Sequence, residues 1–196
     1  MSKILISGYY GFANAGDEAM LTAIIESLRQ VEKNVELTVL SGNPEDTAAK
    51  HQVCSVYRFN PLGIIQAMKD SELIISGGGS LLQDVTSKRS LLYYLSIIGL
   101  GKFFGKKVML FAQGIGPIRA KWARKLTSLV CNEADLITVR DSESAAELIE
   151  MGVKPEKITV TADSVLSLNP VTKECGQYLL QEAGVDLTKP VIGISV

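Results

Sequence analysis

Short apolar runs alternate along this chain with longer stretches in which apolar residues recur every three or four positions. The short runs predict strands, and the longer stretches predict amphipathic helices. Several short runs are apolar without alternation, as expected for strands that are covered on both faces. We therefore expect strands at 3–7, 35–40, 53–57, 73–76, 108–112, 136–139 and 158–161, and helices at 17–31, 62–70, 88–104, 119–134, 142–151 and 174–183.

This alternation of strand and helix predicts the fold class and the division of the chain. Repeated βα units are typical of an α/β fold with a Rossmann-like, doubly wound parallel sheet. The length of 196 residues fits one domain and the start of another. The sequence closes on an apolar run at 191–196, with a polar stretch before it. We expect residues 1–184 to form one domain, 185–190 a linker, and 191–196 the first strand of a truncated C-terminal domain.

Composition removes several classes of protein. Hydrophobic residues make up 46% and charged residues 21%, which is typical of a globular protein, and a net charge of −1 does not favour a nucleic-acid partner. Three cysteines without a Cys-x-x-Cys pair favour reduced thiols and a cytoplasmic location. We see no metal-ligand cluster, because His51 is the single histidine. The apolar run at the N-terminus is too short for a signal peptide, and the longest uncharged stretch, 90–101, is too short for a bilayer-spanning helix.

The loop after the first predicted strand is the first candidate site. Ligands of open α/β sheets bind at the carboxyl ends of the strands, and glycines let a backbone approach an anion or a sugar. The spacing is neither that of a dinucleotide-binding loop nor that of a P-loop, and no acidic residue ends the second strand, so a dinucleotide is disfavoured. The alternative is a tight turn with Asp17 as a helix cap. The candidates here are Gly11, Asn14, Gly16, Asp17 and Glu18.

Four further strands end in glycine or polar residues. Three consecutive glycines directly after a buried strand favour close contact between the backbone and another group. Each of the remaining loops has a simpler explanation when it is taken alone, since Arg140 can form a surface pair with Asp141 and Asp163 can be a turn residue. The candidates from these loops are Gly77, Gly78, Gly79, Gln83, Asp84, Gln113, Arg140 and Asp163.

A basic segment is the other regional signal. No Asp or Glu occurs between Val85 and Asn132, where nine Lys and Arg residues lie, while the rest of the chain carries a charge of −10. Such a segment suits anionic lipid headgroups or a diphosphate. The residues that we expect at a membrane surface are Lys102, Phe103, Lys106 and Lys107. The alternative is a solvated basic face whose aromatic residues lie in the core.

Four ordered motifs together resemble the polysaccharide pyruvyltransferase family, and most closely its CsaB-type enzymes, which modify secondary cell-wall polysaccharide. The motifs are Gly8-Tyr-Tyr-Gly-Phe-x-Asn-x-Gly-Asp-Glu-Ala19, Ser76-Gly-Gly-Gly-Ser-Leu-Leu-Gln-Asp84, Gln113-Gly-Ile-Gly-Pro117 and Thr138-Val-Arg-Asp-x-x-Ser144. The resemblance covers nearly the whole chain. It implies the N-terminal half of a GT-B-like, two-domain transferase that serves cell-wall biogenesis and S-layer anchoring.

The resemblance also implies a reaction. The family transfers a pyruvyl group from phosphoenolpyruvate to two hydroxyls of a sugar, which gives a 4,6-ketal. We expect N-acetylmannosamine of a lipid-diphosphate-linked precursor as acceptor, no cofactor, and a cytoplasmic protein that is peripheral at the inner face of the membrane. The family's remaining phosphoenolpyruvate contacts lie in the C-terminal half, so we expect this chain alone to be inactive.

The same resemblance implies roles for individual residues. Asp17 and Glu18 are the acid and base candidates, Arg140 is expected to meet phosphoenolpyruvate, and Gly77 to Gly79 to face the acceptor sugar or its diphosphate. Two other functions stay open on sequence. One is a nucleotide-sugar glycosyltransferase of GT-B architecture, and the other is a carbohydrate-binding domain without catalysis.

Overall fold

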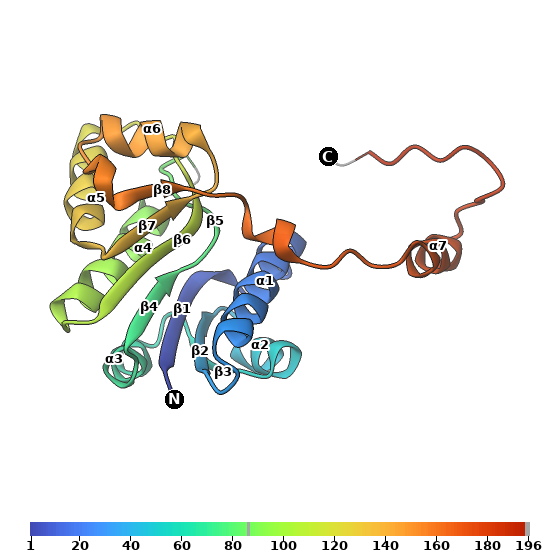
Figure 1. Ribbon diagram of the computed structural model, residues 1–196, viewed down its shortest axis with the longest axis horizontal. Helices are drawn as coiled ribbons and strands as arrows, with labels where there is room; N and C mark the ends of the chain where they lie inside the picture. The colour runs from blue at the N-terminus through green and yellow to red at the C-terminus, as the bar shows by residue number, and fades with distance from the viewer. Residues whose placement is uncertain (86, 195–196) are drawn as a thin grey trace.

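A single parallel sheet forms the centre of the molecule. The computed structural model describes residues 1–85 and 87–194, and the sheet order is β3-β2-β1-β4-β6-β7-β8, with β5 paired to β6 (Figure 1). This arrangement confirms the predicted α/β, Rossmann-like fold. The strands are β1 (Lys3–Tyr10), β2 (Glu36–Ser41), β3 (Cys54–Tyr57), β4 (Leu73–Ser76), β5 (Gly79–Leu82), β6 (Lys107–Ile115), β7 (Leu136–Val139) and β8 (Ile158–Val160).

Helices cover both faces of the sheet. One apolar cluster joins α1 to one face, and a second cluster joins α3, α4, α5 and α6 to the other. Neighbouring residues of β1 show why these runs are apolar without alternation, because Leu5 and Ile6 belong to different clusters and both are fully buried. The helices are α1 (Ala15–Val31), α2 (Pro44–His51), α3 (Pro61–Asp70), α4 (Lys88–Phe103), α5 (Lys121–Glu133), α6 (Ser142–Glu150) and α7 (Lys173–Glu182), with 3-10 turns η1 (Pro155–Lys157) and η2 (Ser164–Ser167).

The strand order reverses between β1 and β4. From β1 the chain moves outward through β2 to β3, then returns to β4 on the other side of β1 and continues through β6 to β8. The two central strands are paired in register, with Ser7 opposite Ser76. Ligands of open α/β folds bind where the order reverses, at the carboxyl ends of the strands. The loops that follow β1 and β4 both begin at this point.

The structure adds a helix and a strand that the sequence pattern did not predict. Helix α2 has one buried residue, Thr47, so it lacks the apolar stripe by which a helix is recognised in sequence. Strand β5 begins at Gly79, within a stretch that we expected to be only a loop. Strand β1 also continues beyond the expected Ser7, as far as Tyr10.

The C-terminal part of the chain departs from the sheet. Helix α7 lies apart from the sheet in Figure 1, and none of its residues is buried. The expected strand at 191–196 falls partly outside the described residues, which end at 194, and residues 191–194 form neither strand nor helix. The division into a domain, a linker and a second domain stays a prediction. Among the residues that the structure describes, no helix has the length and apolar character needed to cross a membrane.

Candidate active site

The loop between β1 and α1 places two acidic side chains at the start of a helix. Asn14 caps α1, because its side-chain oxygen accepts hydrogen bonds from the backbone N–H groups of Gly16 and Asp17 at 3.0 and 3.2 Å. The alternative interpretation of Asp17 as the helix cap is therefore wrong. The Asp17 carboxylate does not accept the hydrogen bonds that cap the helix, so it is available to interact with other groups.

Asp17 lies in a partly enclosed pocket. Burial, with the neighbouring Glu18 carboxylate as a second cause, raises the pKa of Asp17 to about 6. Gly79, which has a φ of +92°, faces this carboxyl group, and a Cβ there would come within 3.1 Å of an Asp17 oxygen. The hollow, which we call the Asp17 pocket, has a volume of about 320 Å³ and is lined by Tyr9, Asp17, Ser80, Leu81, Gln83, Ser90 and Tyr94.

Glu18 points elsewhere although it is the next residue. One of its oxygens accepts a hydrogen bond from the Gly11 backbone N–H at 2.8 Å, and the other lies 3.4 Å from Nε2 of His51. Both acidic residues were expected to take part in proton transfer. The structure places only Asp17 in the pocket and gives Glu18 contacts that hold the loop against α2.

We expect Glu18→Ala to lower the free energy of unfolding by about 1–3 kcal/mol, because the substitution removes the acceptor of the Gly11 N–H. Glu18→Gln keeps an oxygen that accepts this hydrogen bond and should retain most of the stability. Urea unfolding of both variants measures the effect. A Glu18→Gln variant of normal stability but with turnover reduced a hundredfold or more would instead place Glu18 in the chemistry.

A buried side-chain amide holds the glycine turn after β4 in place. Gln113 is fully buried, and its Nε2 donates to the Ser76 hydroxyl at 2.7 Å and to the Gly77 carbonyl at 3.1 Å. Gly77, Gly78 and Gly79 are buried as well. The structure thus shows Gln113 as a residue that positions the glycine turn. Direct contact of these four residues with substrate stays a prediction.

Arg140, which follows β7, reaches the Asp17 pocket through Ser80. Its guanidinium donates to the Ser80 hydroxyl at 3.1 Å and forms an ion pair of 3.1 Å with Asp163, which follows β8. It also lies 3.5 Å from Asp141. Gly114 makes room for the guanidinium, since a Cβ at that position would lie 2.8 Å from Arg140 Cζ. Arg140 and Asp163, from the loops after β7 and β8, therefore meet Ser80 of β5 at one place.

Asp84 has a structural role in this chain. Its carboxylate accepts hydrogen bonds from the backbone N–H groups of Arg119 and Ala120 at 2.9–3.0 Å, just before α5 begins, and these bonds lower the pKa of Asp84. Gln83, its neighbour, lines the Asp17 pocket and accepts from the Val85 N–H at 2.9 Å. Of the two residues, only Gln83 lines the pocket.

Sequence reasoning missed five of the seven residues that line the pocket: Tyr9, Ser80, Leu81, Ser90 and Tyr94. Tyr9 stands in the first motif and Ser80 in the second, but the chemistry of these motifs points to their glycines, amides and carboxylates. Tyr94 comes from α4, in a run that gives no sign of function. Aromatic residues beside a carboxylate in a glycine-rich motif would have been the signal to follow.

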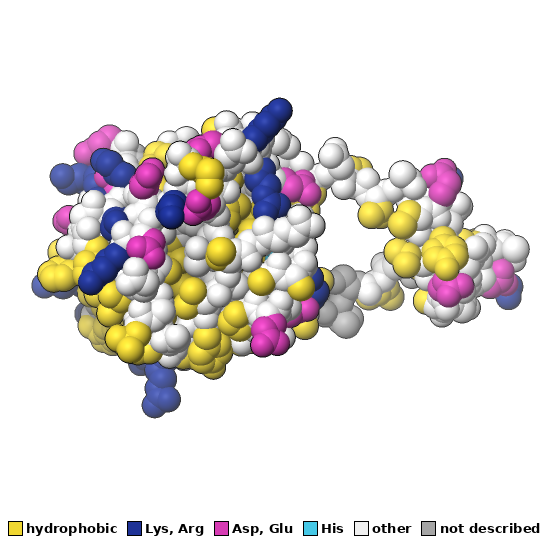
Figure 2. Space-filling model, turned by 90° about the horizontal axis from the view of Figure 1, so that it is seen from below, with side chains coloured by type: hydrophobic (Ala, Val, Ile, Leu, Met, Phe, Trp, Pro, Cys, Tyr) yellow, Lys and Arg dark blue, Asp and Glu magenta, His cyan; other side chains and the backbone are white. Residues whose placement is uncertain are grey.

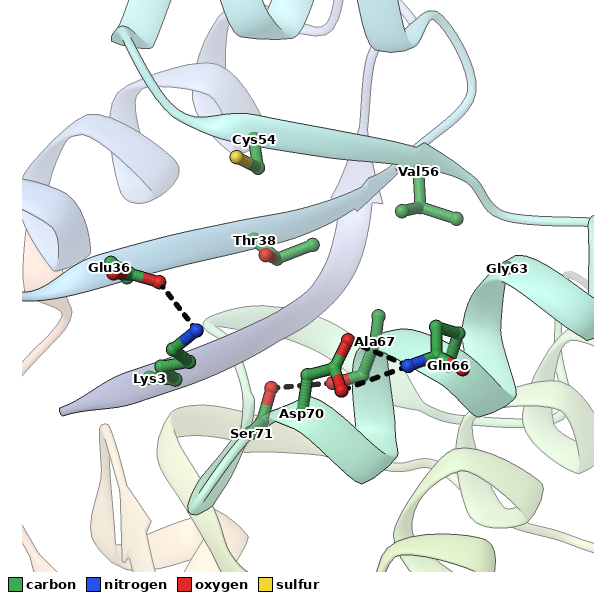
Figure 3. Close-up of a pocket in the computed structure, with 10 residues that line it drawn as sticks. All are labelled: Lys3, Glu36, Thr38, Cys54, Val56, Gly63, Gln66, Ala67, Asp70 and Ser71. Carbon is green, nitrogen blue, oxygen red and sulfur yellow. Dashed lines mark hydrogen bonds and ion pairs between the residues drawn. The ribbon is translucent and has the colours of Figure 1, made fainter.

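Another hollow lies at the other end of the first three strands. It has a volume of about 330 Å³ and is shown in Figure 3, between α3 and the neighbouring strands. Four of its polar side chains are paired with one another: Lys3 with Glu36 at 3.1 Å, and Gln66 with Asp70 at 2.9 Å. None of the predicted site residues lines it, so it is not part of the candidate site.

The basic segment reaches the amino ends of the strands, opposite the candidate site. Lys102 and Lys107 both pair with Asp135, at 2.7 and 3.2 Å, and Lys106 donates to the Lys69 carbonyl. On the face shown in Figure 2, basic and acidic side chains lie interspersed. Phe103 is 81% exposed, which suits the predicted membrane contact, whereas the paired lysines weaken it. That contact stays a prediction.

Within 1–85 and 87–194, no cluster of three or more His, Cys, Asp or Glu side chains has the arrangement of a metal site.

This chain resembles known proteins both in its sequence and in its fold. The sequence matches the family described as polysaccharide pyruvyl transferase over residues 14–180. No curated protein matches it.

Similar solved structures include Anabaena HepE with UDP-glucose (TM-score 0.59, 14% identity, 94% of this chain and 50% of that one) and a Rickettsia africae glycosyltransferase (0.55, 12%, 96% and 51%). Neisseria meningitidis UDP-GlcNAc 2-epimerase with UDP-GlcNAc is also similar (0.52, 14%, 92% and 50%). These likenesses show a GT-B-like fold. The chain spans about half the length of each.

Proposed function

Because the chain belongs to the polysaccharide pyruvyl transferase family, we propose that it transfers a pyruvyl group from phosphoenolpyruvate to two hydroxyls of an acceptor sugar. The observation that carries the proposal is the position of Asp17. A carboxyl group with a pKa of about 6 lies in a pocket at the strand reversal, and Ser80 of the same pocket binds the guanidinium of Arg140. The pocket thus combines a proton donor with a nearby cation.

The chemistry assigns a role to each group. Ketal formation begins when the methylene carbon of phosphoenolpyruvate receives a proton and a sugar hydroxyl attacks the neighbouring carbon. The second hydroxyl then displaces phosphate, and each hydroxyl gives up its proton. In our proposal the Asp17 carboxyl donates the first proton and, once ionised, accepts one from a hydroxyl. The proton of the other hydroxyl leaves with the phosphate, so the products are the ketal and inorganic phosphate. Arg140 offers a guanidinium to the carboxylate or phosphate of the donor.

The family supports a polysaccharide as the acceptor. We propose a sugar of a polysaccharide precursor, with N-acetylmannosamine in a lipid-diphosphate-linked chain and a 4,6-ketal product as the finer hypothesis. The protein then works at the inner face of the cell membrane and needs no cofactor. Within the site, the ion pair with Asp163 holds Arg140 toward the pocket.

The complete gene product, incubated with phosphoenolpyruvate and N-acetylmannosamine glycosides, should release phosphate and form the ketal. Transfer from UDP-sugars instead would support the glycosyltransferase alternative.

We expect the stability of the protein to depend on the ionisation of Asp17. Its pKa in the folded protein, about 6, lies above the unfolded value of 3.8, so the folded state binds the proton more tightly. Ionisation therefore destabilises the folded state as the pH rises through 6, and no such penalty exists below about pH 4. Asp17→Asn should melt at a higher temperature than the wild type at pH 8, and the difference should shrink at pH 5.

The check is a pair of melting curves at each pH. Asp70→Asn is a suitable control, because Asp70 lies at the end of α3 and lines the other hollow. If the Asp17→Asn difference is the same at pH 5 and pH 8, Asp17 has an ordinary pKa and is not tuned for proton transfer.

A further inference from the structure

A buried arginine lies close to the Asp17 pocket and has no role in the reaction proposed above. Arg58 directly follows β3, and its backbone N–H donates to the Ser41 carbonyl at 2.9 Å, so it belongs to the same edge of the sheet as the pocket. Arg58 is only 5% exposed, which is unusual for an arginine. Burying a charge costs free energy unless other groups compensate it.

No carboxylate compensates the charge of Arg58. Within 1–85 and 87–194, the ion pairs of the structure include none to Arg58, and its buried Nε donates to no group. Cation–π attraction to neighbouring rings offsets part of the cost of burial. Four ring centroids lie 4.3–5.5 Å from Arg58 Cζ, those of Phe12, Phe59, Tyr93 and Tyr94. The remaining positive charge is one that a nearby anion would balance.

The one hydrogen bond of this guanidinium to a described residue goes to Tyr94. Arg58 Nη1 donates to the Tyr94 hydroxyl at 3.5 Å. A guanidinium only donates, so the Tyr94 oxygen is the acceptor and the Tyr94 proton points elsewhere. Among the described residues, no hydrogen bond from this hydroxyl to another group is found. Because burial raises the pKa of Tyr94 above its ordinary value of 10, the hydroxyl keeps its proton and is available as a donor.

A second hydroxyl of the pocket is oriented in the same way. Ser80 accepts a hydrogen bond of 3.1 Å from Arg140, so its proton also points away from a guanidinium. Ser80 and Tyr94 both line the Asp17 pocket, whereas neither arginine does. A hydroxyl that accepts from a cation becomes a stronger donor, since linked hydrogen bonds polarise one another. The pocket thus holds two polarised hydroxyl donors, which suits a ligand with negatively charged oxygens.

The donor substrate of the proposed reaction has such oxygens. Resting on the proposed function, we propose that the Tyr94 hydroxyl binds an oxyanion of phosphoenolpyruvate, either its phosphate or its carboxylate, and that Arg58 is a positioning residue that acts through Tyr94. Arg58 fixes the direction of the Tyr94 proton and polarises the hydroxyl. A neutral sugar hydroxyl gains less from this arrangement, because a hydrogen bond to a charged acceptor is roughly twice as strong as a neutral one.

The test uses phosphoenolpyruvate, inorganic phosphate and pyruvate as probes, titrated into the complete gene product by calorimetry. Tyr94→Phe removes only the hydroxyl and keeps the ring beside Arg58. We expect this variant to bind phosphoenolpyruvate about tenfold or more weakly, because it loses a hydrogen bond to a charged group. The other two probes identify the oxyanion, since the affinity for phosphate or for pyruvate should fall in the same variant.

A double-mutant cycle tests whether Arg58 acts through Tyr94. Arg58→Met removes the charge and keeps a long side chain, and alone it should weaken phosphoenolpyruvate binding about three- to tenfold. In the Tyr94→Phe background the same substitution should change the affinity less than about twofold, because no hydroxyl remains to be oriented. Equal losses in both backgrounds would exclude Arg58 as a positioning residue for Tyr94. If Arg58→Met does not fold, Tyr94→Phe and its control carry the test.

Tyr93→Phe is the matched control. Tyr93 is the neighbouring residue on α4, its ring centroid lies 4.3 Å from Arg58 Cζ, and its buried hydroxyl has no hydrogen-bond partner among the described residues. Tyr93 does not line the Asp17 pocket, so Tyr93→Phe should bind all three probes like the wild type. Equal losses of phosphoenolpyruvate affinity in Tyr93→Phe and Tyr94→Phe would mean that both hydroxyls serve only the fold, which overturns the inference.

The outcomes separate this inference from the proposed function. Wild-type affinity of Tyr94→Phe for all three probes overturns the inference, and pyruvyl transfer by the wild type, measured by phosphate release, then leaves the proposed function intact. Binding of phosphoenolpyruvate or phosphate that depends on Tyr94, without transfer to an N-acetylmannosamine glycoside, upholds the oxyanion site and removes the proposed function. Where transfer occurs, Tyr94→Phe should raise the KM for phosphoenolpyruvate and change the KM for the acceptor less than about twofold.

Discussion

Asp17→Asn is expected to lower the turnover of pyruvyl transfer by about 10²- to 10⁴-fold, which is the usual contribution of general acid–base catalysis. The variant should remain folded, because Asn14, and not Asp17, caps helix α1. An amide of nearly the same size fills the pocket but neither gives nor takes a proton. Turnover of the complete gene product, measured with phosphoenolpyruvate and an N-acetylmannosamine glycoside, checks this result.

Two measurements make the interpretation specific. The pH profile of the wild-type enzyme should change slope near pH 6, the pKa of Asp17, and this change should be absent from the residual activity of Asp17→Asn. Asp70→Asn, which makes the same substitution on α3 outside the Asp17 pocket, should keep wild-type turnover. Normal turnover by Asp17→Asn would remove Asp17 from the reaction.

Arg140→Ala is expected to raise the KM for phosphoenolpyruvate about tenfold or more. A charge-assisted hydrogen bond contributes roughly 1.5–3 kcal/mol, and the guanidinium reaches Ser80 of the pocket at 3.1 Å. Arg140→Lys should rescue part of the loss, since an ammonium keeps the charge but not the planar fork. Steady-state kinetics with phosphoenolpyruvate as the varied substrate measure both variants.

The control for this prediction is an arginine of similar exposure in another place. Arg124 of α5 also pairs with carboxylates, Glu147 at 2.6 Å and Glu150 at 3.2 Å, and lines no part of the Asp17 pocket. Arg124→Ala should lower stability without raising the KM for the donor. If Arg140→Ala leaves the KM and turnover unchanged, Arg140 serves only its ion pair with Asp163.

Local signals in the sequence were enough to determine the fold. Runs such as 73–76 are apolar at every position up to the serine that ends them, and strands of this kind are covered on both faces, so the alternation with helices already implied a doubly wound sheet. The same reasoning identified the loops of the site, because all parallel strands end at one edge. Glycine-rich and polar stretches after the first and fourth strands therefore had to lie near each other.

Only the tertiary structure separated the roles of Asp17 and Glu18. Neighbours on a helix point about 100° apart, so adjacent carboxylates meet different surroundings. Glu18 finds its partner His51 on α2, a helix with one buried residue and no recognisable pattern. The Asp17 carboxyl group instead faces Gly79 and lines the Asp17 pocket.

Arg58 and Gln113 show the same limit of sequence reasoning. Each depends on partners far along the chain: Arg58 on rings of the first loop and of α4, and Gln113 on the turn after β4. Periodicity and motifs report whether a residue is apolar, polar or flexible, and this determined the fold and the position of the site. Which side chains share a pocket depends on how helices and strands from distant parts of the sequence pack together, and only the folded chain decides that.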